Sequence, residues 1–291
     1  MPPRLVSLAI LVYWMVAAFF LLTWEVLPEL TLGYPPDLRT IATAAGTNPG
    51  PVTWAIEVVD DRAKPDARRT VGSATTESLR AADGGYRMIS DIELDASGLL
   101  KRTPLAAVAG TDVTLSIEGR YDVSPKGDLR SFEMDVRTLG IGENLLTVEG
   151  KVRDGVMEVS TRAIAPILNR RMKFPYESKG VVYDSLRPLD RLPGLQVGQR
   201  WDAKVVNPLT GAVETARVTV EKRTLIDWNG EAVSAFEVAQ TAGPIKARTW
   251  AALDGTILRQ QVPIPMVDMI LERLPEGAPK PVAEPAGEDR R

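Results

Sequence analysis

The sequence predicts an all-β protein built around a large curved antiparallel sheet or half-barrel. Apolar and polar residues alternate with a period of two in successive segments after residue 51. Asp-Gly and Asn-Gly pairs, which favour tight hairpins, fall between these segments and join neighbours in sequence. The predicted sheet is therefore mainly a meander, with one face toward water.

The first element is predicted to be a helix. Residues 5–24 carry no charge, and a helix of that length rises roughly 30 Å, the thickness of a bilayer's hydrocarbon core. We interpret residues 1–24 as an N-terminal transmembrane anchor. Arg4 precedes the apolar run and Glu25 and Glu29 follow it, which predicts a cytoplasmic N-terminus and an extracytoplasmic remainder. A cleaved signal peptide is the alternative, but no small-residue pair lies at the right distance.

The rest of the chain divides by composition. A Pro- and Gly-rich spacer (25–50), a first β block (51–176), a Pro- and Gly-rich crossover (177–200) and a second β block (201–263) follow one another. The two blocks could form one β domain or two.

The C-terminal end is predicted to contain a short helix followed by a disordered tail. Met266, Met269, Ile270 and Leu274 recur at helical spacing, which predicts a short amphipathic helix over 264–274. The remaining residues, 275–291, are rich in Pro, Glu and Ala and are interpreted as a disordered tail.

Composition removes several classes of function. The chain has 291 residues, a net charge of −3, and neither histidine nor cysteine. Disulfides, thiolate nucleophiles, histidine-based triads and imidazole metal sites are thereby excluded, and no basic face argues for nucleic acid. We predict no cofactor, no metal and no catalytic residue. Carboxylate, lysine or tyrosine chemistry remains the alternative.

The apolar stripes of the predicted strands define a candidate ligand site. A curved sheet with aliphatic residues on its concave face can hold a lipid-like ligand. The candidate residues are Val113, Leu115, Ile117, Met134, Leu146 and Val148. The alternative is that the same stripe forms a filled core, and the apolar segment 97–110 is either a lid or a packed loop.

Two basic clusters are candidate contacts for anionic headgroups or an anionic envelope polymer. They are Arg62, Lys64, Arg68 and Arg69, and then Arg170, Arg171 and Lys173. Solvated turns are the alternative.

The chain resembles two related groups of bacterial proteins. The apolar N-terminal run and spacer resemble those of membrane-anchored envelope proteins of unknown function, planctomycete proteins among them. LQVGQRWDAKVVNPLTG (195–211) and ARTWAALDGTILRQQVPI (247–264) resemble periplasmic β-rich domains associated with transglutaminase-like proteins. The architecture is more distantly similar to lipoprotein-carrier half-barrels. The resemblance implies no catalytic residue, and the transglutaminase Cys and His are absent.

These observations predict a non-enzymatic protein of the inner membrane, single-pass, with its C-terminal domain in the periplasm. It would bind a lipid-like ligand in the concave face or scaffold an envelope complex. Its expected partners are the membrane, through residues 5–24, and a lipid or envelope protein. The alternative function is an enzyme that acts on envelope glycan or peptide.

Overall fold

The computed structural model describes residues 4–21, 50–59, 68–95, 113–139, 144–164, 166, 169–176, 182–184, 189–206, 213–243, 245–264 and 267–283. The predicted lid at 97–110, nearly all of the spacer, Arg62 and Lys64 lie outside the described residues.

A helix forms near the N-terminus, as the apolar run predicts. It is α1, Arg4–Leu21. Its large apolar side chains between Ile10 and Phe20 are exposed. In the part of the chain that the structure describes, no helix combines the length and apolarity needed to cross a membrane. The anchor over residues 5–24 therefore stays a prediction.

Fifteen strands make up the rest of the described secondary structure. They are β1 (Val52–Val59), β2 (Arg68–Arg80), β3 (Tyr86–Asp95), β4 (Thr114–Val123), β5 (Leu129–Leu139), β6 (Asn144–Arg153), β7 (Val156–Ala163), β8 (Arg170–Pro175), β9 (Val182–Asp184), β10 (Arg200–Val206), β11 (Val213–Trp228), β12 (Glu231–Ala242), β13 (Ile245–Ala252), β14 (Ile257–Ile264) and β15 (Val267–Arg273).

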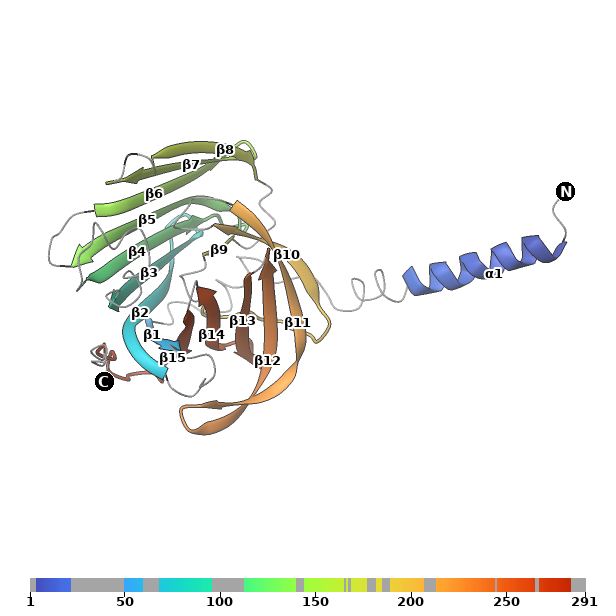
Figure 1. Ribbon diagram of the computed structural model, residues 1–291. Helices are drawn as coiled ribbons and strands as arrows, with labels where there is room; N and C mark the ends of the chain where they lie inside the picture. The colour runs from blue at the N-terminus through green and yellow to red at the C-terminus, as the bar shows by residue number, and fades with distance from the viewer. Residues whose placement is uncertain are drawn as a thin grey trace, which may run out of the picture.

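All fifteen strands belong to one curved sheet (Figure 1). The chain enters at the centre with β1, meanders outward to the edge strand β8, and resumes at the opposite edge with β9. It then meanders inward until β15 pairs antiparallel with β1. Only β9 and β10 pair in parallel among the described strands. The antiparallel, mainly meandering sheet is confirmed. Strands β1–β8 form one half of it and β9–β15 the other, so the second half also includes β9 from the predicted crossover and β15 from the predicted helix.

The predicted C-terminal helix is wrong, because residues 267–273 form strand β15. Strand β15 lies between β1 and β14. Met269 and Leu271 are buried in the main core, and Ile270 is buried on the other face of the strand. A central strand that is apolar on both faces places apolar residues at spacings that also fit an amphipathic helix. Met, Leu and Glu favour helix in isolation, but pairing with two neighbours overrides that preference.

The concave face of the central strands is covered by residues 189–199, which we call the interior segment. Leu192 is fully buried in the main core. Its backbone N–H donates to Gly255 O at 2.7 Å. Gly255 has φ +86°, and a Cβ there would lie 2.5 Å from Leu192 O, so the turn between β13 and β14 requires glycine. At the centre of the sheet, the concave face is therefore a filled core.

Asp190 fixes the interior segment to three strands. Its carboxylate accepts a hydrogen bond from Thr76 Oγ1, which in turn accepts from Trp54 Nε1 at 3.2 Å. Its carbonyl accepts from Ile257 N at 3.1 Å and from Arg273 Nη1 at 3.2 Å. The guanidinium of Arg273 also lies over the Trp54 ring, 5.8 Å from its centroid.

Candidate functional site

The six predicted ligand residues share the inner face of β4, β5 and β6. Ile117 pairs with Val136, which pairs with Leu146, and Met134 pairs with Val148. Because side chains alternate with a period of two, the shared register puts the set on one face with Val113 and Leu115. Five of the six are buried and Leu115 is half-buried. Their common face follows from the alternation, whereas their role in binding stays a prediction.

Several polar atoms that lack a hydrogen-bond partner are buried on or against this inner face, and one more, in Thr75, lies on the opposite face. Among the described residues, the buried side-chain polar atoms that lack a hydrogen bond are Thr75 Oγ1, Thr138 Oγ1, Thr161 Oγ1, Tyr176 Oη and Trp201 Nε1. Thr138 and Thr161 pair with Leu115 and Val148 of the predicted site, at 4% and 7% exposure. Each such atom costs about 1–3 kcal/mol of desolvation, which makes this apolar face an incomplete core.

Sequence reasoning missed these groups. For Thr138 and Thr161 the sequence did contain a signal, since each occupies an inward position in an otherwise apolar stripe. Trp201 Nε1 gave no such signal, because tryptophan is normal in a core and only its unpaired N–H is informative. Thr75, by contrast, lies on the opposite face from its neighbours Ala74 and Thr76.

Tyr176 follows the edge strand β8 and packs into the main core. Its backbone N–H donates to Gly155 O at 2.8 Å. Burial raises the pKa of its phenol from 10.0 to about 12, and the negative charge of Asp128 adds to that effect. The phenol is therefore a protonated, unpaired donor at any physiological pH.

The phenol of Tyr176 is expected to ionise only near pH 12. Because the folded state disfavours the tyrosinate, stability is expected to fall as pH rises from the unfolded value of 10.0 toward about 12. Tyr176→Phe removes this dependence. Tyrosinate absorbance and urea unfolding at about pH 9 and about pH 11 measure the two effects. A Tyr176→Phe variant that loses stability as steeply as the wild type would contradict the assignment.

The margin of the inner face is less buried and carries the cation of Arg170. Val136, Ala163, Met172 and Phe174 are half-buried there. Arg170 of β8 is exposed and pairs in register with Thr161, so its side chain leaves the sheet on the inner side. Apolar surface with a few polar groups at its margin is the usual composition of a ligand site.

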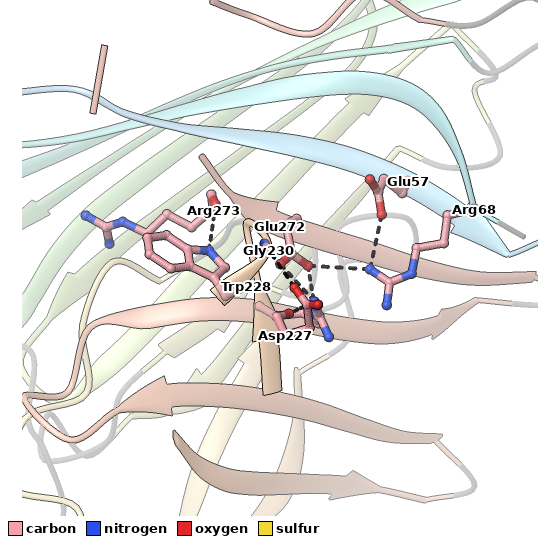
Figure 2. A network of polar contacts seen from close by, with 8 residues as sticks. Glu57, Arg68, Asp227, Trp228, Gly230, Glu272 and Arg273 are labelled. Carbon is pink, nitrogen blue, oxygen red and sulfur yellow. Dashed lines mark hydrogen bonds and ion pairs between the residues drawn. The ribbon is translucent and has the colours of Figure 1, made fainter. Parts of the chain in front are cut away.

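The opposite face carries a polar network at the centre of the sheet (Figure 2). Arg259 donates to both carboxylate oxygens of Glu272, through Nε and, at 2.9 Å, Nη2. Its Nη2 also donates to Asp227 O at 2.7 Å. Arg68 Nη1 lies 3.4 Å from Glu57 Oε2 and 3.6 Å from Glu272 Oε2. Two basic and two acidic side chains therefore occupy one largely buried cluster.

The charged side chains of this network contact one another. Burial raises the pKa of Glu272, against the opposing effects of Arg259 and Arg68. Oε2 of Glu272 accepts from Arg259 Nε and Oε1 accepts from Arg259 Nη2, so each oxygen has a partner within the network. Trp228 Nε1 donates to Arg273 O at 2.9 Å and, with Arg259, joins the end of the β11–β12 hairpin to β15 (Figure 2).

Glu133 and Asp135, two acidic residues that could serve the alternative enzyme, share the outer face of β5. Glu133 is exposed on the outer face, opposite Arg120 and Glu149. Asp135 accepts from Thr147 Oγ1 at 2.7 Å. Across the described residues, no cluster of three acidic side chains is placed to hold a metal ion.

The described members of each predicted basic cluster have different surroundings in the fold. Arg68 belongs to the polar network, so its charge is balanced by Glu57 and Glu272. Lys173 forms an ion pair with Glu158. Arg170 points inward and Arg171 outward, as their positions on β8 require.

The fold and site define an open, single-sheet antiparallel β protein with an apolar inner face. No family model matches the chain, and no curated protein matches it either. A crystal structure described as a β-barrel-like protein of domain of unknown function DUF1849 from Brucella abortus is similar, with a TM-score of 0.47 and 10% identity. The match covers 77% of this chain and 94% of that one.

Proposed function

We propose that this protein binds a single-chain amphiphile on the inner face of β4–β8, without catalysing a reaction on it. The observation that carries the proposal is the set of unpaired polar atoms buried at or against an apolar inner surface, above all Thr138 and Thr161. A native interior rarely leaves such groups without a partner. A bound molecule that supplies acceptor oxygens would satisfy them.

The chemistry of the site favours an anionic, oxygen-bearing head and an aliphatic tail. Thr161 can donate its hydroxyl proton, and Arg170, its register partner on β8, supplies a positive charge. The tail would lie along the half-buried apolar side chains of the same face, Val136, Ala163 and Phe174. A fatty-acid carboxylate is the simplest ligand with both parts.

The edge position of β8 supports a route of entry. β8 and β9 are the two edges of the sheet, so an amphiphile could reach the inner face between them without opening a strand pair. The exposed apolar side chains of α1 support the proposal that residues 5–24 anchor the domain at an inner membrane, with the β domain on the periplasmic side. A membrane would supply amphiphiles at high local concentration.

Thr161→Val tests the proposal with two readouts. In the ligand-free full chain, the variant is expected to be more stable by about 1 kcal/mol, because valine removes an unsatisfied buried hydroxyl and keeps the shape. Its affinity for a fluorescent fatty acid is expected to fall about ten-fold, the value of one hydrogen bond to a charged group. Thermal melts and fluorescence titration measure the two effects.

Thr75→Val is the matched control. It also removes an unpaired buried hydroxyl, but on the opposite face. We expect a similar gain in stability and unchanged fatty-acid affinity. If both variants bind the fatty acid as the wild type does, or if both lose affinity equally, the inner face is not the site.

A further inference from the structure

The outward face of β6, β7 and β8 contains a hollow of about 380 Å³ that the proposed function does not use. Four cations line it, Lys151, Arg153, Arg162 and Arg171, together with the carboxylates of Glu149 and Glu158. The cations come from three neighbouring strands. They lie on the face opposite Val148 and Thr161.

Half of this positive charge is unbalanced, because four cations line the hollow against two carboxylates. Glu149 forms an ion pair with Arg162, and Glu158 forms one with Lys173. Among the described residues, none forms an ion pair with Lys151, Arg153 or Arg171.

The neighbouring positive charges also lower the pKa of the Glu158 carboxyl. Its pKa is lowered mainly by the hydrogen bond from Lys173, and Arg153 and Arg171 contribute further. A chain with a net charge of −3 thus carries a locally positive hollow at one edge of its sheet.

We propose that this hollow binds the anionic headgroup of a phospholipid and so docks the outer face of β6–β8 on a negatively charged membrane surface. Guanidinium groups bind phosphate oxygens in a bidentate manner, and lysine adds a point charge. The inference is independent of the amphiphile site, which lies on the other face of the same strands.

Three observations favour a membrane over a soluble anion. The hollow is open and lies at the surface, so that a headgroup can enter while its acyl chains stay in the bilayer. Val156, at the start of β7 on the same outward face as Glu158, is a large exposed apolar residue beside the hollow. In addition, the exposed apolar side chains of α1 belong to the same chain and would hold the domain near a bilayer.

A site-specific fluorophore tests the docking on the full chain. The protein has no cysteine, so a single Val156→Cys substitution can be labelled beside the hollow. Leu139→Cys, an exposed position on the outer face of β5, is the matched control. Both proteins are mixed with vesicles whose headgroups carry a spin-label quencher, made of phosphatidylcholine alone or with phosphatidylglycerol.

We expect quenching at position 156 that is strong only with phosphatidylglycerol, and weak quenching at position 139 on both vesicles. Each cation near an anionic surface strengthens binding about five-fold, so the double variant Arg153→Glu and Arg171→Glu is expected to weaken docking at least about 25-fold. Arg120→Glu with Arg217→Glu makes the same change in net charge on exposed residues elsewhere and should leave the quenching unchanged.

Equal quenching on both vesicle types, or quenching that survives the Arg153/Arg171 reversal, would overturn the proposal. Inorganic phosphate at constant ionic strength distinguishes the source of the anion. If it releases the label from anionic vesicles and also binds the protein without vesicles, the hollow is a soluble-phosphate site and the lipid assignment is wrong.

Discussion

Replacing Val148 with glutamate is expected to abolish the cooperative thermal unfolding of the β domain. Val148 is fully buried on the inner face, between Met134 of β5 and Thr161 of β7. A carboxylate there would be surrounded by apolar side chains and would cost several kcal/mol. That loss is comparable to the whole stability of an ordinary domain, about 5–15 kcal/mol. Calorimetry of the full chain measures it.

Two further glutamate variants make the result interpretable. Leu115→Glu lies on the same face but is half-buried, so its carboxylate can reach water; the fold should persist while fatty-acid binding is lost. Leu139→Glu is exposed on the outer face and should change neither property. A Val148→Glu protein that melts cooperatively at the wild-type midpoint would mean that the inner face is not packed.

Most strands of the first β block could be predicted because their information is local, but the alternation did not identify β2 or β8. Alternation over 112–123 predicts both strand β4, Thr114–Val123, and which of its side chains face inward. The turns follow from the same short range, since Asn229 and Gly230 both adopt the positive φ values that the Asn-Gly pair predicts.

The pairing that joins the two halves of the sheet could not be predicted in this way. Nothing near Trp54 indicates that β1 pairs with β15, more than two hundred residues later. Without that pairing, the apolar residues of 264–274 fit a helix as well as a strand. The interior segment has the same difficulty, because Asp190 reaches Thr76 and Arg273 only after both halves of the sheet have formed.

The sequence predicted which apolar residues of the candidate site point inward, but it did not predict the unpaired polar groups beside them. Periodicity identifies Leu146 and Val148 as inward residues because their type is the signal. The unpaired state of Thr161 is a property of its surroundings, which the sequence does not describe. The hollow on the other face likewise combines Arg153 and Arg171, which only strand pairing brings together.

Glu272→Ala is expected to destabilise the protein by about 3–5 kcal/mol. The substitution leaves Arg259 in a site where its side chain is only 15% exposed, without the carboxylate that accepts two of its hydrogen bonds. For a domain of this size, the melting temperature should fall by about 10 °C. The end of the β11–β12 hairpin should also exchange its amide hydrogens faster, because Arg259 ties Asp227 to the network.

A double variant separates the cost of an unpaired charge from the value of the pair. Arg259→Met with Glu272→Leu removes both charges and fills the site with apolar atoms, so its stability should return to within about 1 kcal/mol of the wild type or exceed it. Glu158→Ala breaks an exposed pair with Lys173 and should leave the stability nearly unchanged. If the double variant is as unstable as Glu272→Ala, the network itself holds the hairpin against β15, and the hydrogen bond from Trp228 to Arg273 O cannot do so alone.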